Sequence, residues 1–459
     1  MNDCRQKLNS LGLEVPSVLL PQGVDMQKWP VIACDQFTQD RDYWEKAKNA
    51  AEGSPSTLNL IIPEVFLGDG DEAKRIADIH SAMKRYLADG VFGQPRQGFI
   101  YIERDTPYQK KRRGLIAAVD LEHYDWQPSA RPLIRCTEGT VAERLPPRMD
   151  IRRGAPLELP HVMLLIDDDA DELLPALGGR AQKTAPVYTS RLMMDSGSVS
   201  GWFLDAESDL SFIAEKIDAL CRRSAGRYSG DDGKAGQPFL FAVGDGNHSL
   251  AAAKGIWEEY KTSHSTDSRG QDGLPVHACR YALVEIENIY DPAIQFEPIH
   301  RVVFNIDFDK TVSLLSRLPD FSCRPVDSAQ ELVRLCKNPV SANCFGIISQ
   351  GRYALIETSA AGIATACLQP LLDEYAGDNP QLIDYIHDED EVLRLSDGGA
   401  NSPANSASPA SQAVGILLPP VQKSGLFQTV GRLGPLPRKS FSMGHSCEKR
   451  FYLECRGLF

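Results

Sequence analysis

The chain has 459 residues, of which 42% are hydrophobic and 24% charged, which is typical of a soluble globular protein with two or three domain-sized cores. Its formal net charge of −13 counts against nucleic-acid partners, because such binding depends on Lys and Arg neutralising phosphates. The polar N-terminus lacks a signal-peptide core, and no apolar run approaches the roughly 18 residues of a membrane span. The 11 cysteines show no zinc-type pairing, so we expect reduced thiols and a cytoplasmic protein without a membrane partner.

The first half of the chain predicts strands mixed with amphipathic helices. Residues 13–35 are typical of an extended segment that ends in a short strand. A helix is expected over 40–51 with Asp40 as its cap, and 56–67 is expected to form a strand broken by Pro63. Further helices are predicted at 71–90 and 209–224, and further strands at 98–104 and 111–122.

The second half begins with a strand, a tight turn and an Ala-rich helix over 239–260, followed by a strand at 277–289. Residues 396–412 are small, polar and Pro-bearing, which predicts a disordered insertion. Strands and helices alternate unevenly, so we expect a mixed α+β or α/β fold, with a central mixed sheet and flanking helices. The expected division is an N-terminal α/β region, 1–230, and a C-terminal α/β region, 231–459.

The turn at 244–249 combines an acid, an amide, an imidazole and a hydroxyl within a few residues. A turn that enters a helix offers backbone N–H groups and the positive end of the helix dipole, which favour anions such as phosphate. Asp245 is a candidate general base or cation ligand, and His248 is a candidate donor to a phosphoryl oxygen. The remaining candidates bend the backbone or donate without charge: Gly244, Gly246, Asn247 and Ser249.

A simpler interpretation of this turn stays open. Asp, Asn and Ser are favoured at turns and helix caps for local hydrogen-bonding reasons, and Ser249 alone is more typical of a cap than of a ligand. The turn is neither a P-loop nor a dinucleotide fingerprint. The small alanines that follow favour close packing of the helix on a sheet, which places the turn at the carboxyl end of a strand, where open sheets bind ligands.

The stretch "AVGDGNHSLAAAK" resembles the D-G-H-H-R motif of domain-of-unknown-function family 1015. Other stretches resemble the family in the same order, so the resemblance covers nearly the whole chain. They are "WPVIACDQFTQDRDYWEKA", "STLNLIIPEVFL", "RCTEGTVAERLPPR", "EPIHRVVF" and "GPLPRKSFSMGHSCEKRFYLECRGL".

The same turn also resembles the D-G-H-H-R turn of the ParB/sulfiredoxin-like fold, to which free-serine kinases belong. This resemblance implies that Asp245 is the base on the substrate hydroxyl and that His248 contacts the transferred phosphate. Asn247 stands in place of the first His, and Ser249 replaces the Arg, so a guanidinium that would clamp phosphate is missing. The resemblance also implies serine or phosphoserine as the substrate.

A basic loop near the C-terminus is a second candidate site. Arg438, Lys439 and Ser440 stand in "GPLPRKSFSMG", and such a loop suits phosphate or carboxylate. A solvated surface loop is the alternative. His300 and Arg301 stand at the head of an apolar strand from which they could reach the same pocket, although lone His and Arg residues are more often structural.

Two acidic residues are further candidates. Glu138, in "RCTEGT", could be a metal ligand, a second acid/base group or the partner of a substrate amine, and the alternative is a turn in which it pairs with a nearby arginine. Asp35 ends a predicted strand where a ligand could sit, whereas the adjacent Cys34 is more typical of a buried small residue. The acidic run 164–172 favours a solvated turn over a Mg²⁺ site, since EF-hand spacing is absent.

These observations lead to one enzymatic hypothesis and two rivals. The first is a phosphotransferase acting on a small hydroxyl compound, serine-like, in either the kinase or the phosphatase direction, with Mg²⁺ and a nucleotide or pyrophosphate as cofactors. The second is a non-catalytic sensor or scaffold that binds a nucleotide or a phospho-metabolite. The third, a ParB-like nucleic-acid protein, is disfavoured by the net charge. Assembly into a homo-oligomer is left open.

Overall fold

The computed structural model describes residues 2–109, 111–228, 237–264, 277–339, 343–387, 389–396 and 412–459. The chain forms two compact units, a larger one of residues 1–294 and 444–459 and a smaller one of residues 295–443. This division differs from the expected boundary after residue 230, because strands from both sides of that position join one sheet. The expected insertion at 396–412 lies, except for its two end residues, outside the described residues.

A ten-stranded mixed sheet forms the centre of the larger unit, in the order β11-β12-β5-β6-β14-β10-β13-β8-β7, with β1 paired to β6. The pairs β10–β14, β13–β8 and β7–β8 are parallel, and the other pairs are antiparallel. The expected mixed α/β class is therefore confirmed. The strands are β1 (Leu13–Glu14), β5 (Phe99–Asp105), β6 (Arg112–Asp120), β7 (Tyr124–Asp125), β8 (Ile134–Cys136), β10 (Met163–Ile166), β11 (Tyr188–Arg191), β12 (Ser198–Leu204), β13 (Phe241–Asp245) and β14 (Tyr281–Asn288).

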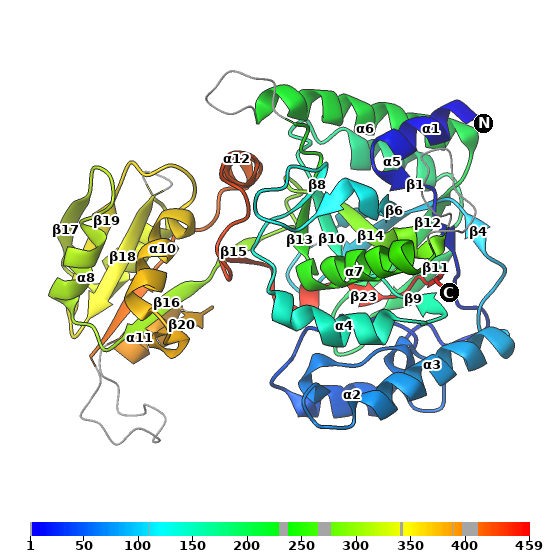
Figure 1. The fold of residues 1–459 in the computed structure, drawn as a ribbon, viewed down its shortest axis with the longest axis horizontal. Helices are drawn as coiled ribbons and strands as arrows, with labels where there is room; N and C mark the ends of the chain where they lie inside the picture. The colour runs from blue at the N-terminus through cyan, green and yellow to red at the C-terminus, as the bar shows by residue number, and fades with distance from the viewer. Residues whose placement is uncertain are drawn as a thin grey trace. The chain divides into compact units, whose positions relative to one another are not determined.

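Helices cover the sheet, with α1, α5 and α6 grouped on one side and α4 and α7 side by side on the other (Figure 1). Three consecutive alanines of α7, 251–253, are buried, which confirms the close packing that the sequence predicted. None of the helices in the described ranges is both long and apolar enough to cross a membrane. The helices are α1 (Asn2–Ser10), α2 (Arg41–Ala51), α3 (Glu72–Ala88), α4 (Leu145–Arg152), α5 (Leu173–Ala181), α6 (Glu207–Arg227) and α7 (Asn247–Ser263).

The segment 56–67 is not the expected strand. It forms two short 3₁₀ turns, η1 (Thr57–Leu60) and η2 (Glu64–Phe66), joined by an extended stretch. The Ser56 hydroxyl accepts from the Leu58 amide and starts the first turn. The apolar residues that suggested a strand, Leu60, Ile61 and Ile62, are buried against the core without pairing to a neighbouring strand.

The last 16 residues, 444–459, which we call the C-terminal segment, return to the larger unit. Its β23 (Phe451–Tyr452) pairs with β3 (Val31–Ile32), and its β24 (Arg456–Gly457) pairs with β9 (Leu157–Glu158). The buried guanidinium of Arg104 donates to the carbonyls of residues 447–449 and fixes the course of the segment. A further short pair joins β2 (Ser17–Val18) to β4 (Arg96–Gln97).

The smaller unit is a six-stranded antiparallel sheet in the order β17-β19-β18-β21-β16-β20, with a separate β15–β22 pair. Neighbouring residues of β16 face opposite cores: Val303 packs in one with α8 and α10, and Val302 in the other with α9 and α11. The elements are β15 (Phe296–Pro298), β16 (His300–Phe304), α8 (Phe308–Leu315), β17 (Ser322–Val326), α9 (Ala329–Lys337), β18 (Cys344–Ser349), β19 (Arg352–Glu357), α10 (Ala364–Ala376), β20 (Ile383–Ile386), α11 (Glu389–Ser396), β21 (Ala413–Leu417), α12 (Lys423–Leu433) and β22 (Phe441–Met443).

Candidate functional site

The strand, turn and helix predicted over 239–260 are confirmed. Strand β13 ends at Asp245, Gly246 has φ 81° in the left-handed region, and α7 begins at Asn247. A Cβ at residue 246 would lie 3.1 Å from both Cα and Cγ2 of Val162. Glycine is therefore required here by the backbone conformation and also by the close approach of the segment that enters β10.

Asp245 is paired with a lysine from the C-terminal segment. Nζ of Lys449 lies 3.3 Å from Oδ2 of Asp245, and the two side chains are 8% and 20% exposed, respectively. Gly246, the N-cap residue of α7, has no side chain with which to cap the helix. A carboxylate, an ammonium group and a helix N-terminus thus meet at the carboxyl end of β13.

A second loop, which follows the neighbouring parallel strand β8, lies at the same end of the sheet. Val243 of β13 lies beside Cys136 of β8, so the residues that follow β8 run past the turn. The amide of Val141 donates to Nε2 of His248 at 3.2 Å. Glu138 belongs to this loop, so the structure brings its segment to the turn.

Asn247 occupies the first position of α7. Its Oδ1 atom is buried and has no hydrogen-bond partner among the described residues. An acceptor in this state is costly unless something donates to it, so a ligand hydroxyl or ammonium group would stabilise it.

Ser249 is not a helix cap, which corrects the simpler interpretation of this residue. Its Oγ lies 2.8 Å from Nε2 of His161, a residue 88 positions earlier in the chain. The other ring nitrogen of His161, Nδ1, lies 2.8 Å from the hydroxyl of Tyr452 in the C-terminal segment. The side chain of Ser249 therefore joins a network that extends across three segments of the larger unit.

Asp35 lies beside the same imidazole, with Oδ2 3.7 Å from Nε2 of His161. Burial alone would raise the pKa of Asp35, but His161, Gln36, Lys449 and Arg148 together lower it below its ordinary value. Asp35 is thus an ionised carboxylate at physiological pH. Lys449, the partner of Asp245, is one of these groups, so Asp35 lies near the turn, and its role as a ligand stays a prediction.

Cys34, next to Asp35, is half-buried and packs against the core of the larger unit. Burial raises the pKa of its thiol far above the ordinary value, so it stays protonated and is a poor nucleophile. It accepts a hydrogen bond from the Tyr452 hydroxyl at 3.1 Å. Nearby, Arg148 forms an ion pair with Glu64, whose pKa is raised by burial against the opposing effect of that arginine.

Five predicted site residues belong to the smaller unit, and their convergence with Asp245 stays a prediction. The Arg301 guanidinium is fully buried and donates to Gln369 and to the carbonyl of Lys439, each at 2.9 Å. Nδ1 of His300 accepts from the amide of Leu418. The buried Ser440 hydroxyl donates to the carbonyl of Pro437. The predicted residues of this unit are His300, Arg301, Arg438, Lys439 and Ser440.

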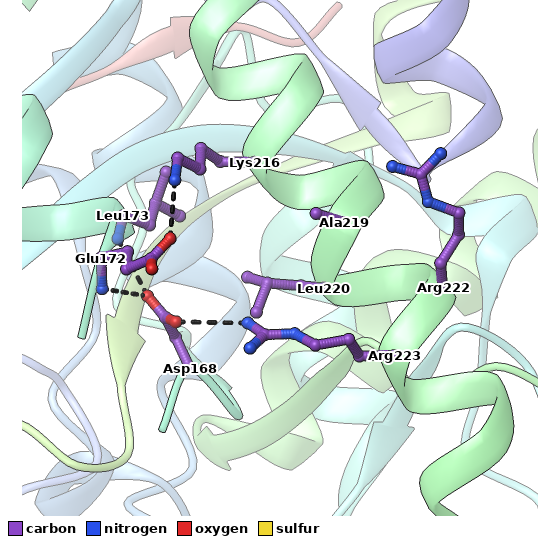
Figure 2. Close-up of a pocket in the computed structure, with 8 residues that line it drawn as sticks. All are labelled: Asp168, Glu172, Leu173, Lys216, Ala219, Leu220, Arg222 and Arg223. Atoms are coloured by element: carbon purple, nitrogen blue, oxygen red, sulfur yellow. Dashed lines mark hydrogen bonds and ion pairs between the residues drawn. The ribbon is translucent and has the colours of Figure 1, made fainter. Parts of the chain in front are cut away.

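The acidic run 164–172 borders a surface pocket of about 440 Å³ beside α6, shown in Figure 2. Oδ2 of Asp168 accepts from the amides of Glu172 and Leu173, and its Oδ1 faces Arg223. Glu172 pairs with Lys216 at 2.7 Å. The acids therefore cap α5 and pair with cations, and in the described part of the chain no group of three or more His, Cys, Asp or Glu side chains could hold a metal ion.

Three site residues were missed by the sequence reasoning: Lys449, Tyr452 and His161. Lys449 and Tyr452 stand in "CEKRFYLECRGL", which was noticed only as a family-like stretch. His161 stands immediately before the apolar β10. The signal in each case was a polar residue next to a buried strand, which becomes informative only when the strand order is known.

The fold and site define an α/β protein with a polar strand-to-helix turn in its larger unit. The chain belongs to the family described as "Protein of unknown function (DUF1015)", which its sequence matches over residues 20–375. The comparison with curated proteins gives no match.

Solved structures provide distant similarities. A conserved hypothetical protein from Pyrococcus furiosus is 11% identical, with a TM-score of 0.33 over 74% of this chain and 90% of that one. A free serine kinase in complex with AMP is 11% identical, with a TM-score of 0.37 over 76% and 94%. SbnI with C-terminal truncation, from Staphylococcus aureus, is 9% identical, with a TM-score of 0.33 over 72% and 82%. We base no conclusion on similarities of this strength, and the ParB/sulfiredoxin-like component stays a prediction.

Proposed function

We propose that this chain is a phosphotransferase that acts on the hydroxyl of a small metabolite, serine-like, at the turn that follows β13. The observation that carries the proposal is the position of Asp245, at a strand end, 3.3 Å from the ammonium group of Lys449 and directly before the N-terminus of α7. Phosphoryl transfer requires little covalent chemistry from the protein, and positioned charge supplies most of the catalysis.

In this proposal Asp245 accepts the proton of the acceptor hydroxyl as its oxygen forms a bond to phosphorus. The bond from phosphorus to the oxygen of the donor, a nucleotide or pyrophosphate, breaks in the same displacement. Lys449, His248 and the first amides of α7 stabilise the negative charge on the transferred group. Glu138 and Asp35 are further polar residues at the same end of the sheet, and the reverse direction uses the same groups.

Lys449 supplies the cation that the turn itself lacks. In the resemblance to free-serine kinases, Ser249 stands where an arginine would clamp phosphate. A lysine is a point charge without the bidentate geometry of arginine, but it serves as a phosphate ligand in many proteins. In this proposal Lys449, a residue of the C-terminal segment, therefore takes the phosphate-binding role that the arginine of the turn has in the motif.

The described carboxylates do not form a protein cage for Mg²⁺. Mg²⁺ usually enters phosphotransferase sites on the phosphates of the substrate, with one or two protein carboxylates as ligands. Asp245 and Asp35 are the two that fit this limited role, and the metal would supply charge neutralisation on the donor phosphates.

The test is a transfer screen with serine and phosphoserine, each combined with ATP, ADP or pyrophosphate, followed by release or transfer of labelled phosphate. Asp245→Asn should lower kcat by about 10²–10⁴-fold, the usual contribution of a general base. Lys449→Met should lower it by about 10²-fold or more. Glu172→Gln and Lys216→Met are matched controls, because they break a similar acid–lysine pair at the pocket of Figure 2. Unchanged turnover in Asp245→Asn would refute the proposal.

A second candidate function is a sensor or scaffold that binds a nucleotide or phospho-metabolite without turnover. The pairing of Asp245 with Lys449 favours it, because this carboxylate is already engaged in an ion pair within the protein. A binder predicts a melting temperature that rises with ligand excess over Kd while no product forms. The same protein sample distinguishes the two functions, since only the enzyme consumes the donor.

A further inference from the structure

Three side chains of the larger unit form a connected chain that the phosphotransfer proposal does not use. Ser249 Oγ lies 2.8 Å from Nε2 of His161, and Nδ1 of the same ring lies 2.8 Å from the hydroxyl of Tyr452. The three residues come from the first turn of α7, the segment before β10, and β23. A hydroxyl next to an imidazole that is itself oriented by a third group is the usual signature of an activated nucleophile.

The tautomer of His161 sets the directions of its hydrogen bonds with Ser249 and Tyr452. Burial raises the pKa of Tyr452 well above its ordinary value, so this residue is a phenol with one proton to donate. In the tautomer of His161 that carries Nδ1–H, this hydrogen is donated to the phenolic oxygen, whose own proton points to Sγ of Cys34 at 3.1 Å. In this tautomer the lone pair of Nε2 faces the hydroxyl of Ser249. Ser249 donates to His161, as a serine must before it loses its proton to a general base.

A carboxylate stands where positive charge would develop. Oδ2 of Asp35 lies 3.7 Å from Nε2, the nitrogen that would receive the serine proton. An imidazolium at this position gains the attraction of the ionised Asp35, while Tyr452 keeps the ring in place.

The serine and its base open on a cavity. Ser249, His161, Tyr452 and Cys34 line a space of about 140 Å³. A cavity of about 150 Å³ with apolar walls holds one benzene ring. The space next to the serine thus accepts a short acyl chain and excludes a long one. Its other walls are mainly apolar and include Leu60, Ile61, Ile62, Leu157, Leu159 and Leu250.

We propose that Ser249 is the nucleophile and His161 the general base of a second catalytic site, which hydrolyses carboxylic esters of short acyl chains. Oγ of Ser249 forms a bond to the carbonyl carbon while its proton passes to Nε2 of His161. The tetrahedral intermediate collapses, the bond to the alcohol oxygen breaks, and the alcohol leaves with the proton from Nε2. Water, deprotonated by His161, then attacks the acyl-serine, releases the carboxylic acid and restores the hydroxyl of Ser249.

This proposal does not rest on the phosphotransfer proposal, with which it shares only Asp35. The nucleophile is Ser249 and not the acceptor of a transferred phosphoryl group, and no step involves Asp245 or Lys449. The replacement of the motif arginine by Ser249 gives this chain a hydroxyl at that position. Labelling of Ser249 in a protein that shows no phosphotransfer would support this inference while the proposed function failed.

The test uses the full-length protein, a fluorophosphonate probe and p-nitrophenyl esters of acetate, butyrate and decanoate. Peptide mass spectrometry should find the probe on Ser249, and acetate and butyrate esters should be hydrolysed at least tenfold faster than decanoate. Ser249→Ala should lose the label and at least 100-fold in kcat. Ser263→Ala is the matched control, because this exposed serine in the last turn of α7 contacts two backbone carbonyls of its own helix and the ring of the adjacent His264.

Two further variants separate catalysis from folding. Ser249→Cys keeps a nucleophile in place and should react with p-nitrophenyl acetate to give a thioester at residue 249. Tyr452→Phe retains the aromatic wall of the cavity and should lower kcat at unchanged KM, because only the partner of Nδ1 is lost. Labelling at any other residue, or equal ester hydrolysis by the wild type and Ser249→Ala, overturns the proposal.

Discussion

Two buried glutamates on β14 allow a sharp test of the electrostatics in the core of the larger unit. Glu285 and Glu287 face the same side of the strand, and both are almost fully buried. Glu285 forms an ion pair with Arg450 at 2.5 Å, and Glu287 lies 2.9 Å from Nε of Arg112. Burial and the neighbouring Glu285 raise the pKa of Glu287 well above its ordinary value, despite Arg112. Burial opposes ionisation of Glu285 too, but Arg450 and Arg112 lower its pKa.

Of the two carboxylates, Glu287 is the one with the raised pKa, and the sign of its effect on stability follows. An unfolded glutamate titrates near about pH 4.3. Between that pH and the higher pKa of Glu287 in the folded protein, the folded state binds more protons than the unfolded state. The free energy of unfolding consequently falls as the pH rises through this window, by at most about 1.4 kcal/mol per pH unit.

Glu287→Gln retains an uncharged, hydrogen-bonding side chain and should remove the fall in the free energy of unfolding with rising pH. At pH 8 its free energy of unfolding should equal or exceed that of the wild type. Glu285→Gln removes a charge that faces Arg450, and loss of one partner of a buried pair costs about 3–5 kcal/mol. We expect the lower end, about 3 kcal/mol, because Arg450 keeps its ion pair with Glu454.

The measurement is urea unfolding at pH 5, 6, 7 and 8, followed by tryptophan fluorescence. All 5 tryptophans of the sequence precede residue 295, so the signal reports on the larger unit alone. A Glu287→Gln variant that is as destabilised as Glu285→Gln at pH 8, or that keeps the wild-type loss of stability with pH, would refute the assignment of the proton.

Three other perturbations have defined outcomes. Gly246→Ala places a Cβ on a residue in the left-handed conformation and should lower the free energy of unfolding by about 1–2 kcal/mol. Gly139→Ala, which has open space around it, should change the free energy of unfolding little. Equal effects of the two substitutions would contradict the role of Gly246 in the turn. Deletion of 444–459 should abolish the cooperative urea transition seen by tryptophan fluorescence, and a retained sharp transition would show that the C-terminal segment is dispensable. Because burial raises the pKa of Cys34, iodoacetamide at pH 8 should leave it unmodified by mass spectrometry until urea is added.

Local sequence signals predicted the parts of the fold that depend on local interactions. The helix at 40–51 has its N-cap at Asp40, whose side chain accepts from the amide of Tyr43, and Trp44 is buried as its helical spacing indicated. The turn at 244–249 was also predicted correctly, because a buried strand, a glycine and an Ala-rich helix follow one another directly. In these segments, propensity, capping and apolar periodicity agree.

Tertiary packing decided the parts that sequence reasoning missed. The apolar stretch 56–67 has the composition of a strand but no neighbouring strand with which to pair, so its side chains are buried from 3₁₀ turns instead. The two units divide at a position other than residue 230 for a related reason, because β13 and β14 belong to the same sheet as β1. Pairing partners that are distant along the chain leave no local signal.

The candidate site also depends on residues that are distant along the chain and leave no local signal. Sequence reasoning looked for a cation in the basic loop at 438–440, because that loop gathers charge visibly. The larger unit instead presents Lys449 to Asp245 and Tyr452 to His161, since β23 pairs with β3 near the N-terminus. Both proposed chemistries therefore depend on one event in folding, the return of the C-terminal segment to the larger unit. A chain that stops before this segment would retain the motif at the turn but lack Lys449 and Tyr452, on which the two proposals rest.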